Sequence, residues 1–300
     1  MELRDLRYFS HIASSGHLGR SAEELRLTQP ALTKSVARLE RELNVKLFDR
    51  TAKGMVLTAA GAQLQRHAMR LQVATEEAVR ELTDMATGTA GHVTVGTGLV
   101  MTDHLLAAAC TQLVEKYPRV TVDISTGVSE GLISALRDGK FDLVLSGLPA
   151  VPEPDLCYEE ISQDSVVVVA RKGHRLHSVR KVELETLLQE RWALPKSGST
   201  LSNWLFSRFR AASSPVPTPS ITADSFSTLL AIVASTNLLT FQSTSAIGSS
   251  PWRHQLSLLR SGPLVWKRRI GVTYTRERYL PTAAKTLVSL LRVVAAAVPP

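Results

Sequence analysis

The chain has 300 residues, of which 44% are apolar and 21% are charged, and its formal net charge is +8. This length predicts two or three domains, and the apolar fraction indicates a globular rather than a disordered chain. The sequence has no run of about 18 apolar residues and opens on the charged segment MELRDLRYF, so we expect no membrane span, no signal peptide and a cytoplasmic protein. The positive charge favours a polyanionic partner, although a generally basic soluble protein is an equally simple alternative.

The two cysteines, Cys110 and Cys157, lie far apart in the sequence and have no CxxC spacing or neighbouring histidine. We therefore predict no metal site and no cofactor, and we expect both thiols to be buried as small apolar groups. A redox pair is the alternative, and a reducing compartment disfavours it.

Helical spacing recurs three times in the first 45 residues. Leu6, Phe9 and Ala13 follow Asp5, which we predict to be an N-cap, and Gly16 ends this helix. A second short helix runs from about 18 to 25.

The third helix begins after Thr28, a good N-cap, with Pro30 in its first turn. Its apolar positions form one stripe, composed of Leu32, Val36, Leu39 and Leu43.

The other faces of the third helix carry polar and basic residues, as in a helix that enters a DNA major groove. Gln29 can pair with an adenine edge and Lys34 with guanine acceptors, whereas Arg38, further along the helix, suits a phosphate. Two short extended pieces flank 51–54, which predicts a hairpin, or wing, that carries Arg50 and Lys53 to the DNA. The predicted DNA-binding residues are Thr28, Gln29, Pro30, Thr33, Lys34, Arg38, Arg50 and Lys53.

Three segments, LRYF, TQPALTKSVARLERELNVKLFDR and KGMVLTAAG, resemble the LysR-type transcriptional regulators. The chain has Thr33-Lys34 where the family often has Ser-Arg, and a lysine lacks the planar fork of arginine. The resemblance implies a winged helix-turn-helix, a linker helix that dimerises, and a two-lobed effector domain like that of periplasmic binding proteins. It also implies a tetramer of two dimers, and RNA polymerase is a further candidate partner.

A long helix is predicted from Thr58, its N-cap, to about Ala86. Its apolar and small residues alternate steps of four and three, which is typical of a coiled-coil seam. Packing on its own domain is the alternative, but a helix of this length exceeds what a 60-residue domain needs. The predicted dimerisation residues are Leu64, Ala68, Leu71, Thr75, Ala78, Leu82 and Met85. A dimer would present two recognition helices to an inverted-repeat operator in double-stranded DNA.

From residue 91 onward, strands alternate with helices in a βαβαβ order, which predicts a parallel sheet. A second series starts at SVVVVA (165–170), and IGVTY (270–274) with a final helix closes the chain. We predict crossovers between two α/β lobes near Gln163 and Pro263. The predicted domains are a DNA-binding domain (1–58), a linker helix (59–90) and an effector domain (91–300), with lobe I at about 91–163 and 268–300 and lobe II at about 164–267.

Hydroxyl groups follow the carboxyl ends of the predicted strands, where open parallel sheets bind ligands near helix N-termini. Such positions favour a carboxylate, so we predict an organic-acid effector, although each Ser or Thr alone is more often a simple N-cap. Phe226 and Phe241 could add an apolar wall, with core packing as the alternative. The predicted effector-binding residues are Thr97, Thr102, Thr126, Ser129, Ser146, Ser199, Thr200, Ser225 and Phe226.

No catalytic constellation stands out, so we predict that the chain is not an enzyme. VGTGLVM lacks the third glycine of a dinucleotide loop, and LPKSGST lacks the glycines of a P-loop. Arg171, His174, Arg175 and His177 form a basic cluster, interpreted as a solvated turn. The competing class is a solute-binding or transferase-like module whose N-terminal helices only oligomerise, and it predicts DNA binding that is absent or insensitive to salt.

Overall fold

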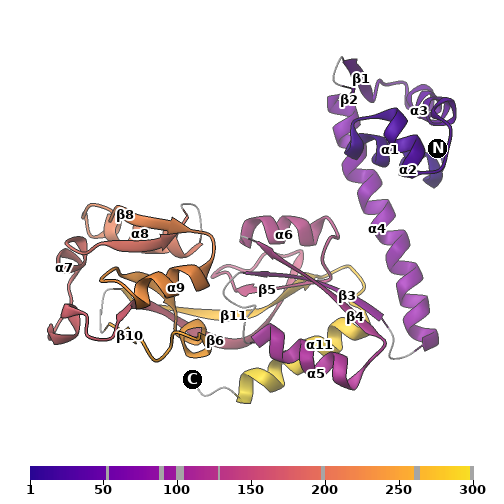
Figure 1. Cartoon of the computed structure of the whole chain (residues 1–300). Coiled ribbons are helices and arrows are strands. Elements are labelled where there is room, and N and C mark those ends of the chain that lie inside the picture. The colour runs from indigo at the N-terminus through magenta and orange to yellow at the C-terminus, as the bar shows by residue number, and fades with distance from the viewer. Residues whose placement is uncertain are drawn as a thin grey trace. The chain divides into compact units, whose positions relative to one another are not determined.

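The structure is a computed structural model that describes residues 1–51, 54–87, 91–98, 105–127, 129–196, 200–259 and 264–297. For residues 50, 84–87, 129, 200 and 249 it describes the backbone alone. The chain divides into two compact units, Met1–Ala86 (unit 1) and Thr87–Pro300 (unit 2) (Figure 1).

Unit 1 is a winged helix-turn-helix, as predicted. Its helices pack around the fully buried side chains of Phe9, Ile12, Leu32 and Leu39. Its elements are α1 (Leu3–Ser15), α2 (Leu18–Glu24), α3 (Gln29–Leu43), β1 (Phe48–Thr51), β2 (Gly54–Leu57) and the long α4 (Ala59–Thr87), which begins in the unit 1 core.

Three local predictions in unit 1 are corrected. Asp5 does not cap α1, because the helix begins at Leu3 with Glu2 at the N-cap, and the Asp5 side chain is buried. Thr28 does occupy the N-cap of α3, but its hydroxyl makes no capping hydrogen bond. Leu43, at the end of the apolar stripe, is 38% exposed because α3 ends beyond the core.

Two close backbone contacts place the wing and α4. The Met55 amide donates to the Gly16 carbonyl over 2.8 Å, and a Cβ on Gly54 would lie 2.4 Å from that oxygen. A Cβ on Gly61 would lie 2.0 Å from the Leu47 carbonyl oxygen, so α4 can cross the entry to the wing only with glycine there. Thr58 caps α4 as predicted, accepting from the Gly61 amide.

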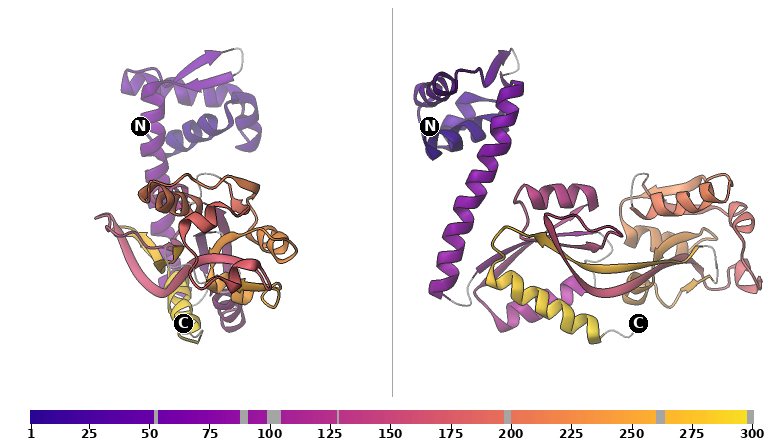
Figure 2. Two further views of the ribbon diagram at one scale, coloured as in Figure 1. Left: turned by 90° about the vertical axis from the view of Figure 1, so that its left-hand side faces the viewer. Right: turned by 180° about the vertical axis from the view of Figure 1, so that it is seen from behind.

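Unit 2 is a two-lobed α/β domain with a mixed, curled sheet in the order β10-β6-β11-β5-β3-β4, and β9 also pairs with β6. In lobe I, β4 and β5 flank β3 in parallel, as the βαβαβ pattern predicts. Here α5 and α11 cover one face of the sheet and α6 the other (Figures 1 and 2). In chain order, the first elements of unit 2 belong to lobe I and are β3 (Gly91–Gly98), α5 (Ala107–Lys116), β4 (Val120–Gly127), α6 (Ser129–Arg137) and β5 (Leu143–Gly147).

Lobe II contains a second small parallel sheet, in which β7 pairs with β8. The remaining elements of unit 2 are β6 (Leu156–Arg171), a 3₁₀ helix (Arg175–Ser178), α7 (Leu184–Leu188), β7 (Trp192–Pro195), α8 (Thr200–Ala211), β8 (Pro219–Ala223), α9 (Phe226–Ala234), β9 (Thr240–Ser243), α10 (Thr244–Ser249), β10 (Leu256–Leu258), β11 (Trp266–Thr275) and α11 (Thr282–Ala297).

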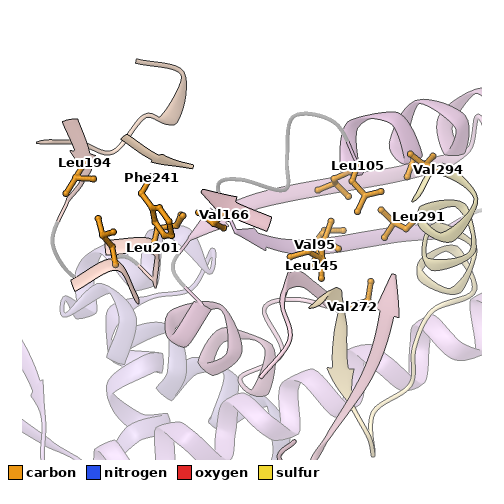
Figure 3. Close-up of a cluster of buried hydrophobic side chains, with 14 of the residues drawn as sticks. Val95, Leu105, Leu145, Val166, Leu194, Leu201, Phe241, Val272, Leu291 and Val294 are labelled. Carbon is orange, nitrogen blue, oxygen red and sulfur yellow. The ribbon is translucent and has the colours of Figure 1, made fainter. Parts of the chain in front are cut away.

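Two long antiparallel strands, β6 and β11, connect the lobes, where the sequence predicted crossovers. Gln163 lies in the middle of β6 and pairs with Arg269, while Pro263 lies outside the described residues. The sequence did not predict this part of β6, because residues 159–164 are mostly polar and belong to a ribbon with an exposed face. The apolar core is also continuous between the lobes. Val166 on β6 belongs to the same cluster as Val95 and Leu145 in lobe I and Phe241 in lobe II (Figure 3).

A buried ion pair links the ribbon strands. The Arg268 guanidinium donates to Asp164 Oδ2 over 3.1 Å from Nε and 2.7 Å from Nη2. Asp164 Oδ1 accepts from the Ser243 hydroxyl over 2.9 Å, and only 2% of the Asp164 side chain is exposed. Each carboxylate oxygen is therefore satisfied inside the protein, as a buried charge requires.

We predict that Asp164→Asn destabilises unit 2 by about 3 kcal/mol, because it leaves the Arg268 charge buried without its partner. Urea unfolding followed by tryptophan fluorescence measures this, since all four tryptophans lie in unit 2. The matched control is Asp224→Asn, which removes the exposed partner of Lys196 and should cost less than about 1 kcal/mol. Equal losses in the two variants would contradict the structural role of Asp164.

Candidate nucleic-acid interface and effector region

The N-terminal half of α3 presents an exposed polar surface. Leu32 on its inner side is fully buried, whereas Gln29, Pro30 and Lys34 are exposed. The Thr33 hydroxyl donates to the Gln29 carbonyl over 3.0 Å. A shallow hollow lies here, and its lining residues are Gln29, Pro30, Thr33, Lys34 and Ala37. Four of the predicted DNA-binding residues therefore share one surface.

Arg38, predicted to be a phosphate contact, also has a structural role that the sequence did not reveal. Its Nε donates to Asp5 Oδ2 over 3.0 Å, and its Nη2 contacts Asp5 Oδ1. The Ser35 hydroxyl donates to Asp5 Oδ1 over 2.7 Å. The Arg38 side chain remains 38% exposed, so it can meet a phosphate while it is held by Asp5. The partners are about 30 residues apart, which is why no local pattern indicated the pair.

The Asp5 carboxyl is strongly held in its charged form. Burial by itself would raise its pKa, but the hydrogen bonds from Arg38 and Ser35 and the charge of Arg38 outweigh burial and lower the pKa below its ordinary value. The hydrogen bond to Asp5 and the charge of that carboxylate raise the pKa of Arg38.

A second carboxylate, that of Glu40, attaches the wing to α3. Its Oε1 accepts from the Leu47 amide over 2.8 Å, and its Oε2 accepts from Lys46 Nζ over 2.9 Å. Burial would raise the pKa of Glu40, but these hydrogen bonds outweigh it and lower the pKa. Of the two predicted wing residues, Arg50 lies on β1 with only its backbone described, and Lys53 lies outside the described residues.

The predicted dimerisation seam on α4 divides into two parts. Ala68 is 3% exposed and Leu64 is partly buried, and both pack against the unit 1 core. These two residues are therefore core residues of unit 1, because the three-helix domain needs the first turns of α4 to cover it. The other seam residues with described side chains are exposed, namely Leu71, Thr75, Ala78 and Leu82. For Met85 the structure describes the backbone alone.

The structure brings three of the predicted effector residues together in lobe I. Thr97 on β3 is paired in register with Thr126 on β4 and adjoins Ser146 on β5, all at the carboxyl end of the parallel strands. Thr97 and Ser146 are buried, and their hydroxyls donate to the carbonyls of the next residues, whereas Thr126 is exposed.

In lobe II the strands β7 and β8 also end side by side. Ser225 caps α9 by accepting from the Thr228 amide over 3.2 Å, and Phe226 is half-buried against the core. Lys196, which follows β7, donates to Asp224 Oδ2 over 2.6 Å, and both side chains are exposed. The sequence did not select this lysine as an effector residue. Phe241 is a core residue that stacks on Trp204 at 5.2 Å.

The remaining predicted effector residues are not placed in detail. Ser129 and Thr200 begin α6 and α8, and only their backbone is described. Thr102 and Ser199 lie outside the described residues. No helix in the described ranges combines the length and apolar character that a bilayer span needs.

Two family profiles match the chain. Residues 3–62 match the profile described as "Bacterial regulatory helix-turn-helix protein, lysR family", and residues 86–296 match the profile described as "LysR substrate binding domain".

Curated relatives and solved structures agree with this match. The regulator GbpR of Azospirillum brasilense is 28% identical over 97% of this chain and 86% of its own length, and CfxR of Cupriavidus necator is 33% identical over 69% and 65%. A full-length OxyR variant from Pseudomonas aeruginosa has a TM-score of 0.69 at 24% identity, covering 99% of this chain and 97% of its own. Full-length CbnR complexed with its target DNA has a TM-score of 0.69 at 19% identity, covering 98% and 100%.

Acid should destabilise unit 1 through its two depressed carboxyl groups. Because Asp5 and Glu40 have lower pKa values in the folded unit than in the unfolded chain, their stabilisation is complete above about pH 5 and is lost as the pH falls through the folded values. We predict that the unfolding free energy of unit 1 falls below about pH 5, and that Asp5→Asn reduces this pH dependence.

The measurement is urea unfolding of the full chain between pH 3 and 7, followed by circular dichroism at helical wavelengths. Tryptophan fluorescence identifies the transition of unit 2, because unit 1 has no tryptophan. An Asp5→Asn variant with the full pH dependence of the native chain would refute the role of Asp5.

Proposed function

The chain belongs to the LysR-type transcriptional regulators, which are DNA-binding proteins with an effector-binding domain rather than enzymes, and on that premise we propose how this chain binds DNA and effector. It reads an inverted-repeat operator with α3 and responds to a small carboxylate-bearing effector bound by unit 2. The observation that carries the first part is the exposed surface of α3, whose opposite side is buried.

Each residue of the hollow on α3 has a counterpart in the major groove. The Gln29 amide can bond both the acceptor and the donor of an adenine edge, and Lys34 can bond the acceptors of guanine. Pro30, Ala37 and the methyl group of Thr33 offer an apolar floor suited to a thymine methyl group. The free N–H groups of Arg38 suit a phosphate, and the Asp5 contact fixes their direction.

The exposed part of α4 supports a dimer. Leu71, Ala78 and Leu82 keep the seam spacing, and Leu82 is 67% exposed. Pairing of this seam with a second copy would bury it symmetrically and place two α3 helices about one DNA turn apart. We propose a tetramer of two such dimers, in which a shift between the lobes on effector binding changes how the dimers bend DNA and meet RNA polymerase.

For the effector, the supporting features are the groups at the carboxyl ends of the strands. The N-terminus of α9 has a partial positive charge, and Lys196 provides a full positive charge beside it. An anionic ligand can replace Asp224 as the partner of Lys196.

The likeness to OxyR does not support peroxide as the effector. One OxyR structure, from Corynebacterium glutamicum, is described with bound hydrogen peroxide. In this chain Cys110 and Cys157 are both free and only partly buried, where the sequence predicted burial, and burial raises the pKa of the Cys110 thiol, which disfavours the thiolate that oxidation needs.

We predict that Gln29→Ala relaxes sequence choice without loss of stability. The variant should lose roughly tenfold of the preference for the correct operator base and keep its binding to random duplexes. Titration of fluorescent duplexes with single base changes measures this preference, on an operator selected from random sequences with the native chain.

Arg38→Ala is the informative comparison. It should weaken binding to all duplexes alike and also lower the stability of unit 1, because it leaves Asp5 charged and buried. Undiminished base discrimination by Gln29→Ala, or binding by the native chain that does not fall with salt, would refute the proposed DNA-reading role.

Calorimetry of the full chain with matched acids, amides and amines tests which chemical class of effector it binds. We predict binding of a carboxylate, no binding of its amide, and at least about tenfold weaker binding by Lys196→Gln because one ionic contact is lost. Asp224→Asn should strengthen binding, since it removes the competing carboxylate. Selective binding of neutral or cationic compounds would show that the carboxylate proposal is wrong.

A further inference from the structure

Most of the excess positive charge lies in the unit without the helix-turn-helix. Unit 2 has 22 Lys and Arg against 16 Asp and Glu, a formal charge of +6, whereas unit 1 has a formal charge of only +2. The proposed DNA-reading role of α3 does not account for this distribution. A strongly basic surface of unit 2 therefore needs its own explanation.

The basic charge is concentrated where β6 ends, at the end of lobe II remote from lobe I (Figure 1). The segment 165–182 contains five Lys or Arg and no Asp or Glu. The Lys172 amide donates to the Gln255 carbonyl over 2.7 Å, so Arg253 and His254 lie beside the same turn. We call this surface the basic tip, and its residues are Arg171, Lys172, Arg175, His177, Arg180, Lys181, Arg253 and His254.

The basic tip is held in place by buried groups. His174 is 3% exposed, its Nδ1 accepts from the Leu176 amide over 3.2 Å, and its Nε2 lies 3.3 Å from the Asn237 carbonyl oxygen. Leu176 and Val182 belong to the main core cluster. Gly173 supplies the left-handed turn, with φ at +77°. The sequence predicted a solvated turn here, whereas the structure has a loop anchored by the buried side chain of His174.

Several cations of the basic tip are available to a partner. Arg175 pairs with Glu190, and Lys181 pairs with Glu183, but both cations remain well exposed. Lys172, Arg180 and Arg253 are exposed and have no ion-pair partner among the described residues. Even with nearby Glu185 counted, the surface has six full positive charges against three negative ones.

We propose that the basic tip binds the phosphate backbone of duplex DNA outside the operator, and this rests on the proposed function of α3. The surface offers guanidinium and ammonium groups without an exposed aromatic side chain, which suits phosphates better than a protein partner. Once α3 holds the operator, unit 2 is tethered to the same DNA, so a few weak phosphate contacts act at a high effective concentration.

The test compares two duplexes that carry the same selected operator. One contains the inverted repeat alone, and the other extends it by about 30 base pairs, roughly 100 Å, on each side. Binding of the full chain is measured over a range of salt concentrations. For the native chain the plot of log affinity against log salt should be steeper on the long duplex by about 3 for each basic tip that reaches the DNA, with tighter binding there.

Two triple variants distinguish the effect of the basic tip from the effect of exposed cations elsewhere in unit 2. In K172Q/R180Q/R253Q the extra salt dependence on the long duplex should disappear, at about one unit of slope per cation, while binding to the short duplex stays unchanged. The control R119Q/K140Q/R210Q removes three exposed cations from elsewhere in unit 2 and should behave like the native chain.

Three outcomes would overturn the proposal: equal slopes of the native chain on both duplexes, equal effects of the two variants, or equal loss on both duplexes. Full DNA binding by K172Q/R180Q/R253Q with a loss of transcriptional response would indicate an acidic protein partner and also overturn it. Salt-independent binding of the native chain to the short duplex would instead contradict the proposed role of α3.

Discussion

A single buried carboxylate, that of Asp5, determines how the recognition helix is presented. The apolar stripe of α3 fixes which side faces inward, but apolar contacts are not directional and would tolerate rotation or sliding. Asp5 removes that freedom, because its two oxygens accept hydrogen bonds from Ser35 and Arg38 on one face of α3. Glu40, on the same helix, then fixes the start of the wing. Both α3 and the wing are therefore positioned by charged hydrogen bonds within unit 1.

Unit 2 repeats this design at the ribbon between its lobes. Asp164 on β6 receives Arg268 from β11 and a hydroxyl from the end of β9, so three strands converge on one buried charge. A charge of this kind is costly to bury and adds little stability over an apolar core. What it contributes is register: a slip of one residue between β6 and β11 would leave both charges buried and unpaired.

The sequence predicted what depends on local periodicity and failed where distant residues or exposed ribbons decide. The helices of the helix-turn-helix follow from a spacing of three or four residues, Gly16 and the Thr58 cap from the residue types that end and begin helices, and the parallel strands of lobe I from the alternation of strands with helices. Neither Asp5 nor Asp164 has a local signal, since their partners are about 30 and 104 residues away. The assignment of Leu64 and Ala68 to a dimer seam on α4 failed for a related reason. Its spacing is the same whether a residue packs on its own domain, as Ala68 does, or on a second copy.

The ribbon also limits how the lobes can respond to a ligand. The lobes share one apolar cluster through β6, so they cannot separate freely without opening that core. The ladder between β6 and β11 has one irregularity, between Ile270 and Gly271, next to the pairing of β11 with β5. A Cβ on Gly271 would lie 2.3 Å from the Glu159 carbonyl oxygen, so the strands approach more closely here than any other residue would allow. Bulges concentrate twist at one point of a sheet. This irregularity therefore adds twist where β11 meets β5 of lobe I, while the Asp164–Arg268 pair, a few residues along the same strands, fixes the register of the ribbon.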